Sequence, residues 1–460
     1  MTRGEGPAAD HCDRPRDNRR RTPADEVWDD PGSHRSLIEE DAFIAHLVDQ
    51  AGTSLRSLLG GPSISEMRAC HAQVEHALEI ETLLDDFEAR HNRQFVLFAE
   101  LVSSLRCLGR AAQCLHHLRA REPQYYLCWP RSRREDFADR CEDALEFLDR
   151  CFARLQFRAG EECLRWGFAT GAPGATTVPA GARAPEMHLP HDLDTGDDPH
   201  DEAAVARLFG SFRSAHSSMQ SLAAKAGLVG VRDGDTESFT AFFAKNLDEI
   251  QARDIEARLH SLQSAYDTFL RSTPLERTHP RLRSWRGHIS MAYHLAEMVT
   301  QLVHFSERHE DAIQHTPTRT LLAELVDRQG VLRTAHFGLI AIGEVLDEVA
   351  PLNEQLRKSL VPELLLELTI PEGAVLHARP LSLIAQTVTR HGTPVELEIA
   401  GDTVPASSLL AMLLLAGSSP ETRQLSFRGD RDALRALAEL FEGALWNGEE
   451  FDTGAVPSMA

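Results

Sequence analysis

Apolar residues recur at three- and four-residue steps over most of the first 360 residues of the chain. This spacing places them on one face of an α-helix, with polar residues on the opposite face. The pattern predicts helices that pack their apolar faces together in a bundle. The stripes are Met67, Cys70, Val74, Ala77, Ile80, Leu84 and Phe87; Phe98, Leu101, Leu105, Leu108, Ala112 and Leu115; and Phe137, Cys141, Ala144, Leu148, Cys151 and Leu155.

Two stretches without apolar periodicity divide the chain. Residues 1–34 mix Arg, Asp, Pro and Gly and predict a flexible tail, and residues 169–203 turn to Gly, Pro, Ala, Thr and Asp and predict a linker. Helical block 1 is therefore expected over 35–168 and helical block 2 over 204–360. The stripes of block 2 are Val205, Leu208 and Phe212; Ile255, Leu259, Leu262, Tyr266 and Phe269; and Leu321, Leu325, Leu332 and Leu339.

Two local signals concern helix starts and internal repetition. The Ser-x-x-Glu patterns at Ser36 and Ser63 resemble capping boxes and predict helix starts. Residues 91–122 and 279–310 align without gaps, which is compatible with a duplication of the helical block or with chance similarity between amphipathic helices. The identities are the two end residues, Arg93 with Arg281, Gln113 with Gln301, and His116 with His304.

After Pro351 the period changes, and short strands alternate with short helices. The order strand, helix, strand, strand, helix, strand, helix predicts an α+β domain, a βαββαβα open-faced sandwich, over 361–447, followed by a tail over 448–460. Gly401-Asp402 is the expected hairpin turn. The fold class is thus multidomain, with a large all-α N-terminal region and a C-terminal α+β domain. The first strand is a mostly apolar run over 364–370, broken by Glu367, and the middle helix covers 408–416. The other C-terminal apolar positions are Leu381, Ile384, Ala385, Val388, Val395, Leu397, Ile399, Leu425, Phe427, Leu434, Leu437, Phe441 and Leu445.

Composition excludes some classes of function. The formal charge of -22, from 48 basic and 70 acidic side chains, argues against a nucleic-acid partner bound through a general basic surface. The start of the chain is rich in Arg and Asp, and no apolar run is long enough to span a membrane. We therefore expect no membrane insertion, no secretory signal and a cytoplasmic location.

The eight cysteines lie between Cys12 and Cys163, without a CxxC pair, and mostly at apolar helical positions. We expect reduced, buried thiols rather than a disulfide framework.

Cys107, Cys114, His116 and His117 lie close together on one predicted helix. The three-residue spacing of Cys114 and His117 could direct both toward a metal ion, but it supplies only two ligands. Core or boundary positions are the simpler interpretation, so we predict neither a metal site nor any other cofactor.

The hexapeptide Val375-Leu376-His377-Ala378-Arg379-Pro380 lies between the first strand and the first helix of the predicted α+β domain. It resembles the active-site motif of the HPr family, the histidine phosphocarriers of the phosphoenolpyruvate-dependent phosphotransferase system, and the order of elements agrees. Val375 departs from the pattern, because the family usually has glycine there. A positive φ at that position would strain valine, unless the nearby Gly373 provides the freedom.

The resemblance implies that His377 carries a phosphoryl group. A neutral imidazole is a nucleophile near pH 7, and a helix start offers backbone amides and a positive dipole end to phosphoryl oxygens. Ala378 and Arg379 would supply the amides, and the Arg379 guanidinium would add a fixed positive charge. Pro380 suits the first helical turn, where an amide hydrogen has no helical partner.

The resemblance extends to the next helix. Leu409, Leu410 and Leu413 match the stretch through which the family docks its partners, although core packing explains apolar residues equally well. Ser408 matches a serine that is a regulatory phosphorylation site in some members, although a helix cap is the simpler role.

Two functions follow as hypotheses. In the first, the protein is a phosphorelay component rather than a stand-alone enzyme: His377 receives a phosphoryl group from an enzyme I-type kinase and passes it to an acceptor protein. In the second, the HPr-like domain is a diverged binding module on a helical scaffold. We find no catalytic motif in the helical region and expect it to dock a regulator, shield the C-terminal domain or form a homo-oligomer.

Overall fold

The computed structural model describes residues 38–168, 202–227, 236–443 and 445–446. It divides into two compact units, residues 1–46 and 47–460. Of the first unit, the described residues are 38–46, which include the start of helix α1. The predicted tails, most of the predicted linker and Ser36 lie outside the described residues, and the predicted domain limits remain predictions.

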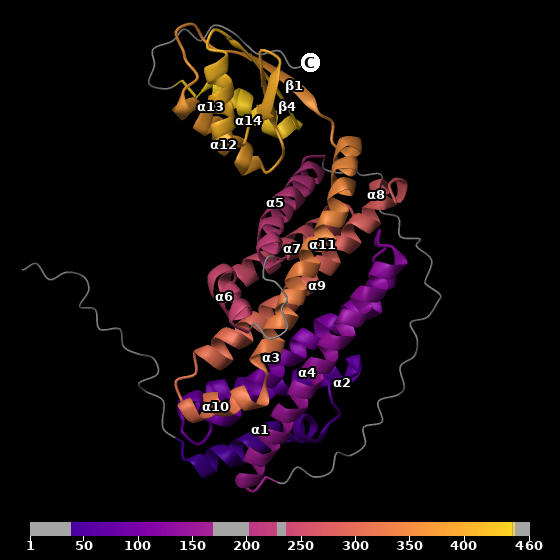
Figure 1. Cartoon of the computed structure of the whole chain (residues 1–460), viewed down its shortest axis with the longest axis vertical. Helices are drawn as coiled ribbons and strands as arrows, with labels where there is room; N and C mark the ends of the chain where they lie inside the picture. Colours follow the sequence, from indigo (N-terminus) through magenta and orange to yellow (C-terminus); the bar gives the residue numbers. More distant parts are fainter. Residues whose placement is uncertain (1–37, 169–201, 228–235, 444, 447–460) are drawn as a thin grey trace, which may run out of the picture. The chain divides into compact units, whose positions relative to one another are not determined.

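The described residues before 361 form helices, so the predicted all-α region is confirmed (Figure 1). The elements are α1 (Glu40–Gly60), α2 (Met67–Asp86), η3 (Ala89–His91), α3 (Val96–Arg121), η4 (Glu122–Gln124), α4 (Arg131–Arg165), α5 (Glu202–Gly227), α6 (Thr236–Asn246), α7 (Glu249–Phe269), α8 (Pro274–Thr278), α9 (Arg281–Ser306), the π-helical turn η5 (Glu307–Asp311), α10 (Thr316–Leu325) and α11 (Arg328–Leu360).

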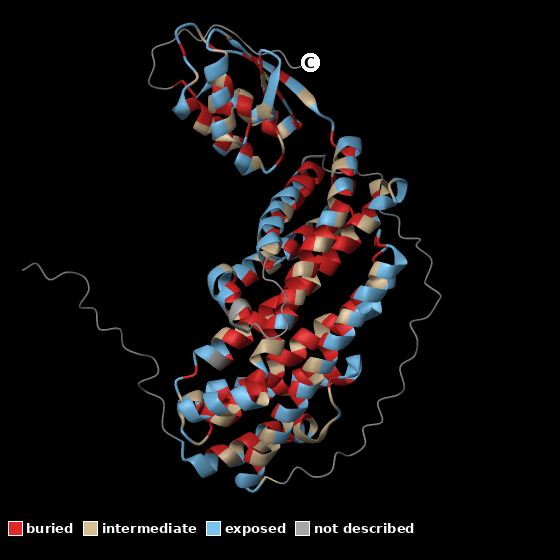
Figure 2. Cartoon of the chain, in the orientation of Figure 1, coloured by how far each residue is buried: buried red, intermediate tan, exposed pale blue. Residues whose placement is uncertain are grey.

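Helices α3 and α9 lie at the centre of this region. Helix α9 packs against α3, α7 and α11, while α3 also packs against α2 and α4. Buried residues line these helices on their facing sides (Figure 2). The two segments that align in sequence contain α3 and α9, which are both 26 residues long and contact each other. The two predicted blocks therefore share a core, while their duplication remains a prediction.

The apolar stripes predict the buried faces well, except at helix ends. Most of the residues in the predicted stripes are buried. Met67, Phe87 and Phe269, however, are 40%, 38% and 40% exposed. They lie in the first or last turn or at the cap of a helix, where a side chain extends beyond the neighbouring helices.

The capping box predicted at Ser63 is wrong. Helix α2 begins at Met67 with Glu66 as its N-cap, and no side chain caps it. The Ser63 hydroxyl instead donates a hydrogen bond to the carboxylate of Asp149 on α4. A contact between distant residues has replaced the local one that the sequence suggested.

The C-terminal domain has the predicted order of elements. Its four strands form an antiparallel sheet in the order β1-β4-β2-β3, and α12, α13 and α14 pack on one face of it (Figure 1). The buried core between sheet and helices includes Leu366, Phe427 and Leu437. The elements are β1 (Leu364–Thr369), α12 (Ala378–His391), β2 (Glu396–Ile399), β3 (Asp402–Pro405), α13 (Leu409–Ser418), β4 (Gln424–Gly429) and α14 (Arg431–Glu442).

The β2–β3 hairpin turns one residue earlier than predicted. Ile399 pairs with Asp402, so the two central residues of the turn are Ala400 and Gly401. Both have positive φ, 56° and 92°, as a type I′ turn requires. Alanine rarely adopts this conformation, so residue type gave no indication of it.

Two further expectations concern the whole chain. No helix in the described ranges has the length and apolar character needed to cross a membrane. The described cysteines are all free thiols, and five of them are buried, whereas Cys114 is half-buried and Cys128 is exposed. Cys12 lies outside the described residues.

Candidate functional site

His377 is the N-cap of helix α12, and its side chain is exposed. Its backbone is extended, with φ −119° and ψ −173°. The backbone N–H of Arg379 donates a hydrogen bond to His377 Nδ1, with 3.3 Å between the nitrogens. Nδ1 accepts this bond through its lone pair, so in the neutral imidazole the proton is on Nε2. The nucleophilic nitrogen is therefore the one that faces the helix start.

The first turn of α12 places backbone amides beside that nitrogen. Ala378 and Arg379 are the first two helical residues, whose N–H groups have no partner within the helix ladder. Pro380, the third residue, is buried and carries no N–H group. A group attached to Nδ1 would lie next to these amides and the positive end of the helix dipole.

The loop before His377 has a residue with positive φ, and this residue is a glycine. Gly373 has a φ of 86°, whereas Val375 is not among the described non-glycine residues with positive φ. Valine is therefore accommodated without backbone strain at the position where it departs from the family pattern. Its side chain is 64% exposed, two residues from His377.

Ser408 is the N-cap of helix α13. Its hydroxyl accepts a hydrogen bond from the backbone N–H of Ala411 at 3.3 Å, and the residue is half-buried. The capping role inferred from sequence is therefore present. Phosphorylation of Ser408 remains a prediction.

The three leucines predicted to dock partners differ in exposure. Leu409 and Leu413 are half-buried and pack against the core of the domain, whereas Leu410 is 69% exposed. Leu414, which the sequence analysis did not single out, is 68% exposed. We call Leu410 and Leu414 the exposed leucine pair. Their four-residue spacing, which puts them on one face of α13, was the signal that could have found them.

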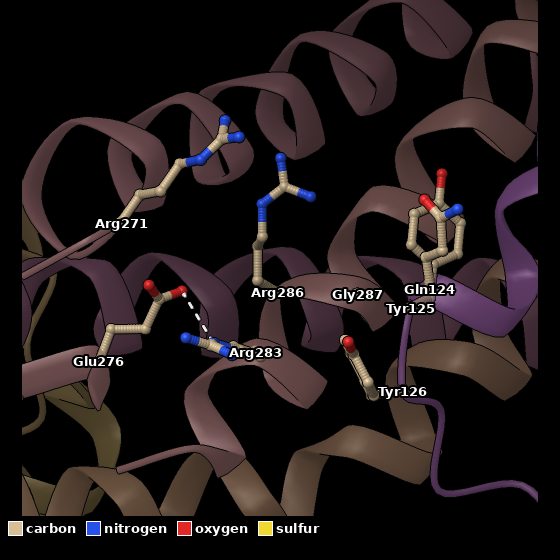
Figure 3. Close-up of a pocket in the computed structure, with 8 residues that line it drawn as sticks. All are labelled: Gln124, Tyr125, Tyr126, Arg271, Glu276, Arg283, Arg286 and Gly287. Carbon is tan, nitrogen blue, oxygen red and sulfur yellow. Dashed lines mark ion pairs between the residues drawn. The ribbon is translucent and has the colours of Figure 1, made fainter. Parts of the chain in front are cut away.

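A separate polar pocket of about 150 Å³ lies in the helical region (Figure 3). Arg286 forms two bonds of 2.9 Å to Asp267, and Arg283 Nε lies 4.0 Å from Glu276 Oε1. These carboxylates offset most of the positive charge, so the pocket is not strongly basic. Its lining residues are Gln124, Tyr125, Tyr126, Arg271, Glu276, Arg283, Arg286 and Gly287.

Comparisons with known proteins match the C-terminal domain that contains His377. Residues 366–443 match the family model of the PTS HPr component phosphorylation site. The phosphocarrier protein HPr of Xylella fastidiosa strain Temecula1 is 33% identical over 78 residues, and that of strain 9a5c is 32% identical over 78 residues. Each match covers 16% of this chain and 88% of the relative. No solved structure matches the chain significantly.

Proposed function

This chain belongs to the HPr family of phosphocarrier proteins through its C-terminal domain, and we propose that His377 accepts and passes on a phosphoryl group. The donor would be an enzyme I-type protein charged by phosphoenolpyruvate, and the acceptor a second protein. The observation that carries the proposal is the position of Nδ1 at the N-terminus of α12, within a hydrogen bond of the Arg379 amide.

The transfer step follows from this geometry. The Nδ1 lone pair attacks phosphorus, an N–P bond forms, and the bond to the donor group breaks, with its electron pair leaving on the donor. The Arg379 N–H, which binds Nδ1 in the unmodified protein, becomes available to a phosphoryl oxygen. The Arg379 guanidinium and the dipole of α12 stabilise the added negative charge. Ala378 supplies a second amide.

The exposed leucine pair and Val375 support docking of the donor and the acceptor near His377. All three side chains are more than 60% exposed. Burying them against a partner would remove apolar surface from water. We propose that the protein and its phosphoenolpyruvate-charged donor meet in the cytoplasm. Docking of a regulator or self-association remains our proposal for the helical region.

The experiment that tests the proposal is incubation of the full chain with enzyme I and phosphoenolpyruvate, followed by intact-mass measurement. We expect one acid-labile phosphoryl group, which His377→Ala abolishes. His391→Ala is the matched control, because His391 lies at the opposite end of the same helix, and it should be phosphorylated normally. A chain that gains no phosphoryl group, or a His377→Ala variant that keeps it, would contradict the phosphocarrier role.

The second candidate function is a binding module without phosphoryl transfer. The exposed side chains of Val375 and of the exposed leucine pair on α13 favour it, because they suit a partner surface whether or not a group is transferred. This function predicts that His377→Ala leaves every partner complex intact. A loss of complexes on that substitution would argue against it.

A further inference from the structure

Three metal-ligating side chains meet where helix α3 packs against α9. Cys107 belongs to α3, His304 to α9, and His309 to the π-helical turn η5. One ligand atom of each lies within 4.8 Å of the others. Cys107 is completely buried, the His309 side chain is 5% exposed, and the His304 side chain is 18% exposed. We call these three residues the Cys-His cluster.

A carboxylate lies beside the Nδ1 atom of each histidine. His309 Nδ1 lies 2.8 Å from Glu100 Oε2, in hydrogen-bond geometry. His304 Nδ1 lies 3.0 Å from Glu249 Oε1, an ion-pair distance without good hydrogen-bond alignment. Both contacts use Nδ1, which leaves Nε2 of each ring for a ligand. This carboxylate-to-histidine arrangement is the usual outer shell of a histidine that binds a metal ion.

Both carboxylates are themselves fixed in place. Arg90 donates to Glu100 at 2.8 Å, and Arg253 and Arg308 donate to Glu249 at 2.8 and 3.0 Å. Because Arg90 balances its charge, Glu100 can orient His309 as a hydrogen-bond acceptor, whereas Glu249 lies at ion-pair distance from His304.

His309 Nε2 is buried and makes no hydrogen bond of good geometry among the described residues, although the Cys107 thiol interacts with the ring. A buried polar nitrogen without a partner costs free energy, typically about 1–3 kcal/mol, so native proteins seldom leave one unless a ligand uses it. Glu100 already occupies the other nitrogen of the ring. An ion bound within the cluster would give Nε2 a partner of good geometry.

The π-helical turn explains how two histidines five residues apart come together. In a regular α-helix such residues lie about 140° apart around the axis. In η5 the backbone N–H of Ala312 instead bonds to the carbonyl of Glu307 at 3.0 Å, and the His304 and His309 ring centres lie 5.3 Å apart. Single π-turns of this kind are frequent at functional sites.

We propose that Cys107 Sγ and the Nε2 atoms of His304 and His309 bind one divalent transition-metal ion of the zinc type. A thiolate with two imidazoles is a donor set that suits tetrahedral Zn²⁺. Zinc–ligand bonds of about 2.0–2.3 Å place tetrahedral ligand atoms about 3.3–3.6 Å apart, so small side-chain shifts would close the present separations. Water, or a ligand entering beside the partly exposed His304, would complete the coordination.

The test is a cobalt titration of the full chain after treatment with a chelator. We expect one equivalent of Co²⁺ with tetrahedral d–d bands and a thiolate-to-cobalt charge-transfer band, and displacement of Co²⁺ by Zn²⁺. Cys107→Ser should lose the charge-transfer band and bind at least about tenfold more weakly. Cys114→Ser is the matched control, because Cys114 is a half-buried cysteine of the same helix outside the cluster, and it should keep both.

A wild-type chain that binds no Co²⁺ overturns the proposal without any variant. A charge-transfer band that survives in Cys107→Ser, or that disappears in Cys114→Ser, overturns it as well. Should Cys107→Ser fail to fold, Glu100→Gln provides a second variant: it should weaken binding about 10–100-fold and keep the band at saturation. Unchanged affinity in Glu100→Gln would count against the outer shell and the site.

Discussion

The surroundings of a histidine decide what it can do, and this chain shows several outcomes for one residue type. His377 is exposed, with Nδ1 directed at a helix start. His116 is buried and bonds to the carbonyl oxygen of Ile64 at 2.8 Å, which makes it a core residue. His309 is buried beside a carboxylate and a thiol. Of these three histidines, His377 is the one that the fold leaves accessible to a protein partner.

His117 predicts a pH dependence of stability. Burial, followed by the positive charges of His294 and Arg121, lowers its pKa to about 4, and the charge of Glu297 only partly opposes this. The unfolded chain, with a histidine pKa near 6.5, binds the proton more readily between these values. The contribution of His117 is therefore complete above pH 6.5 and falls as the pH decreases toward 4, by roughly 1–3 kcal/mol.

Urea unfolding at several pH values between 4 and 7 measures this loss. His117→Gln is the comparison, because a glutamine side chain does not titrate and can still hydrogen-bond with the Tyr125 hydroxyl, which lies 2.9 Å from His117 Nε2. The difference in unfolding free energy between wild type and variant should change across this range. A constant difference would show that His117 does not carry the effect.

Substitutions at Gly373 and at Val375 should differ in their effect on the rate of phosphorylation. Gly373→Ala places a Cβ at a φ of 86°, which costs about 1–2 kcal/mol and shifts the loop that leads to His377, so the rate of phosphorylation should fall several-fold. Val375→Gly changes no strained residue and should alter the rate by less than about twofold through the backbone. Phosphorylation rates with enzyme I measure both. A larger loss from Val375→Gly would mean that the valine side chain itself contacts the donor.

The period of the apolar residues correctly predicted the helices and strands of the C-terminal domain, because each of these elements buries one apolar face. The order of strands and helices in the C-terminal domain followed from the change of period after Pro351, and the hexapeptide then placed His377 at the start of α12. The errors lie where one residue departs from local preference. Ala400 adopts a positive φ, and Ser63 bonds to Asp149 on another helix. Neither is visible in an apolar pattern.

The β2–β3 hairpin offers a test of its turn type. Ala400→Asn creates Asn-Gly, the favoured type I′ pair, and should stabilise the hairpin by roughly 0.5–1 kcal/mol. Gly401→Ala is the opposite case, because a Cβ there meets no atom within 4 Å and acts only through its φ of 92°. It should destabilise by about 1 kcal/mol or more. Hydrogen exchange over residues 395–406 should slow in the first variant and quicken in the second; equal effects would exclude a type I′ turn.

The exposed leucine pair predicts a loss of docking without a loss of stability. Leu410→Ser should lower the apparent affinity for the phosphoryl donor several-fold, because it removes apolar surface that a partner would bury. The stability of the domain should hardly change, because this 69% exposed side chain contributes little to the core. Leu365→Ser is the control, since Leu365 is also exposed but lies on the sheet face away from the helices. Initial rates at varied donor concentration separate the two. A similar effect from both variants would exclude a specific contact at α13.

The apolar pattern along the chain predicts two separate helical blocks. In the structure, α3 of the first block and α9 of the second pack into one core. The Cys-His cluster depends on this packing, because Cys107 and His304 are nearly two hundred positions apart. Periodicity within each helix identifies its buried face but not the helix that covers it. The neighbours of Cys107 on its own helix supply too few ligands for a metal ion, so the sequence alone predicts no metal site there; His304 and His309 come from α9 and η5.

The contact between the two helical blocks at Gly287 of α9 can be tested by adding a Cβ there. A Cβ there would lie 1.9 Å from the carbonyl oxygen of Tyr125, a backbone atom that cannot rotate away. Gly287→Ala should therefore destabilise the chain by about 1–3 kcal/mol or more, since α9 must move away from the segment after α3.

Gly160 of α4 is the matched glycine, because a Cβ there meets nothing within 4 Å. Gly160→Ala should raise the free energy of unfolding by up to about 1 kcal/mol through helix propensity alone. Urea unfolding of the full chain measures both variants. If the two alanine variants change the free energy of unfolding in the same direction, α9 does not pack as closely on the Tyr125 segment as it does in the structure. The close packing of the two blocks, which brings the Cys-His cluster together, would then be contradicted.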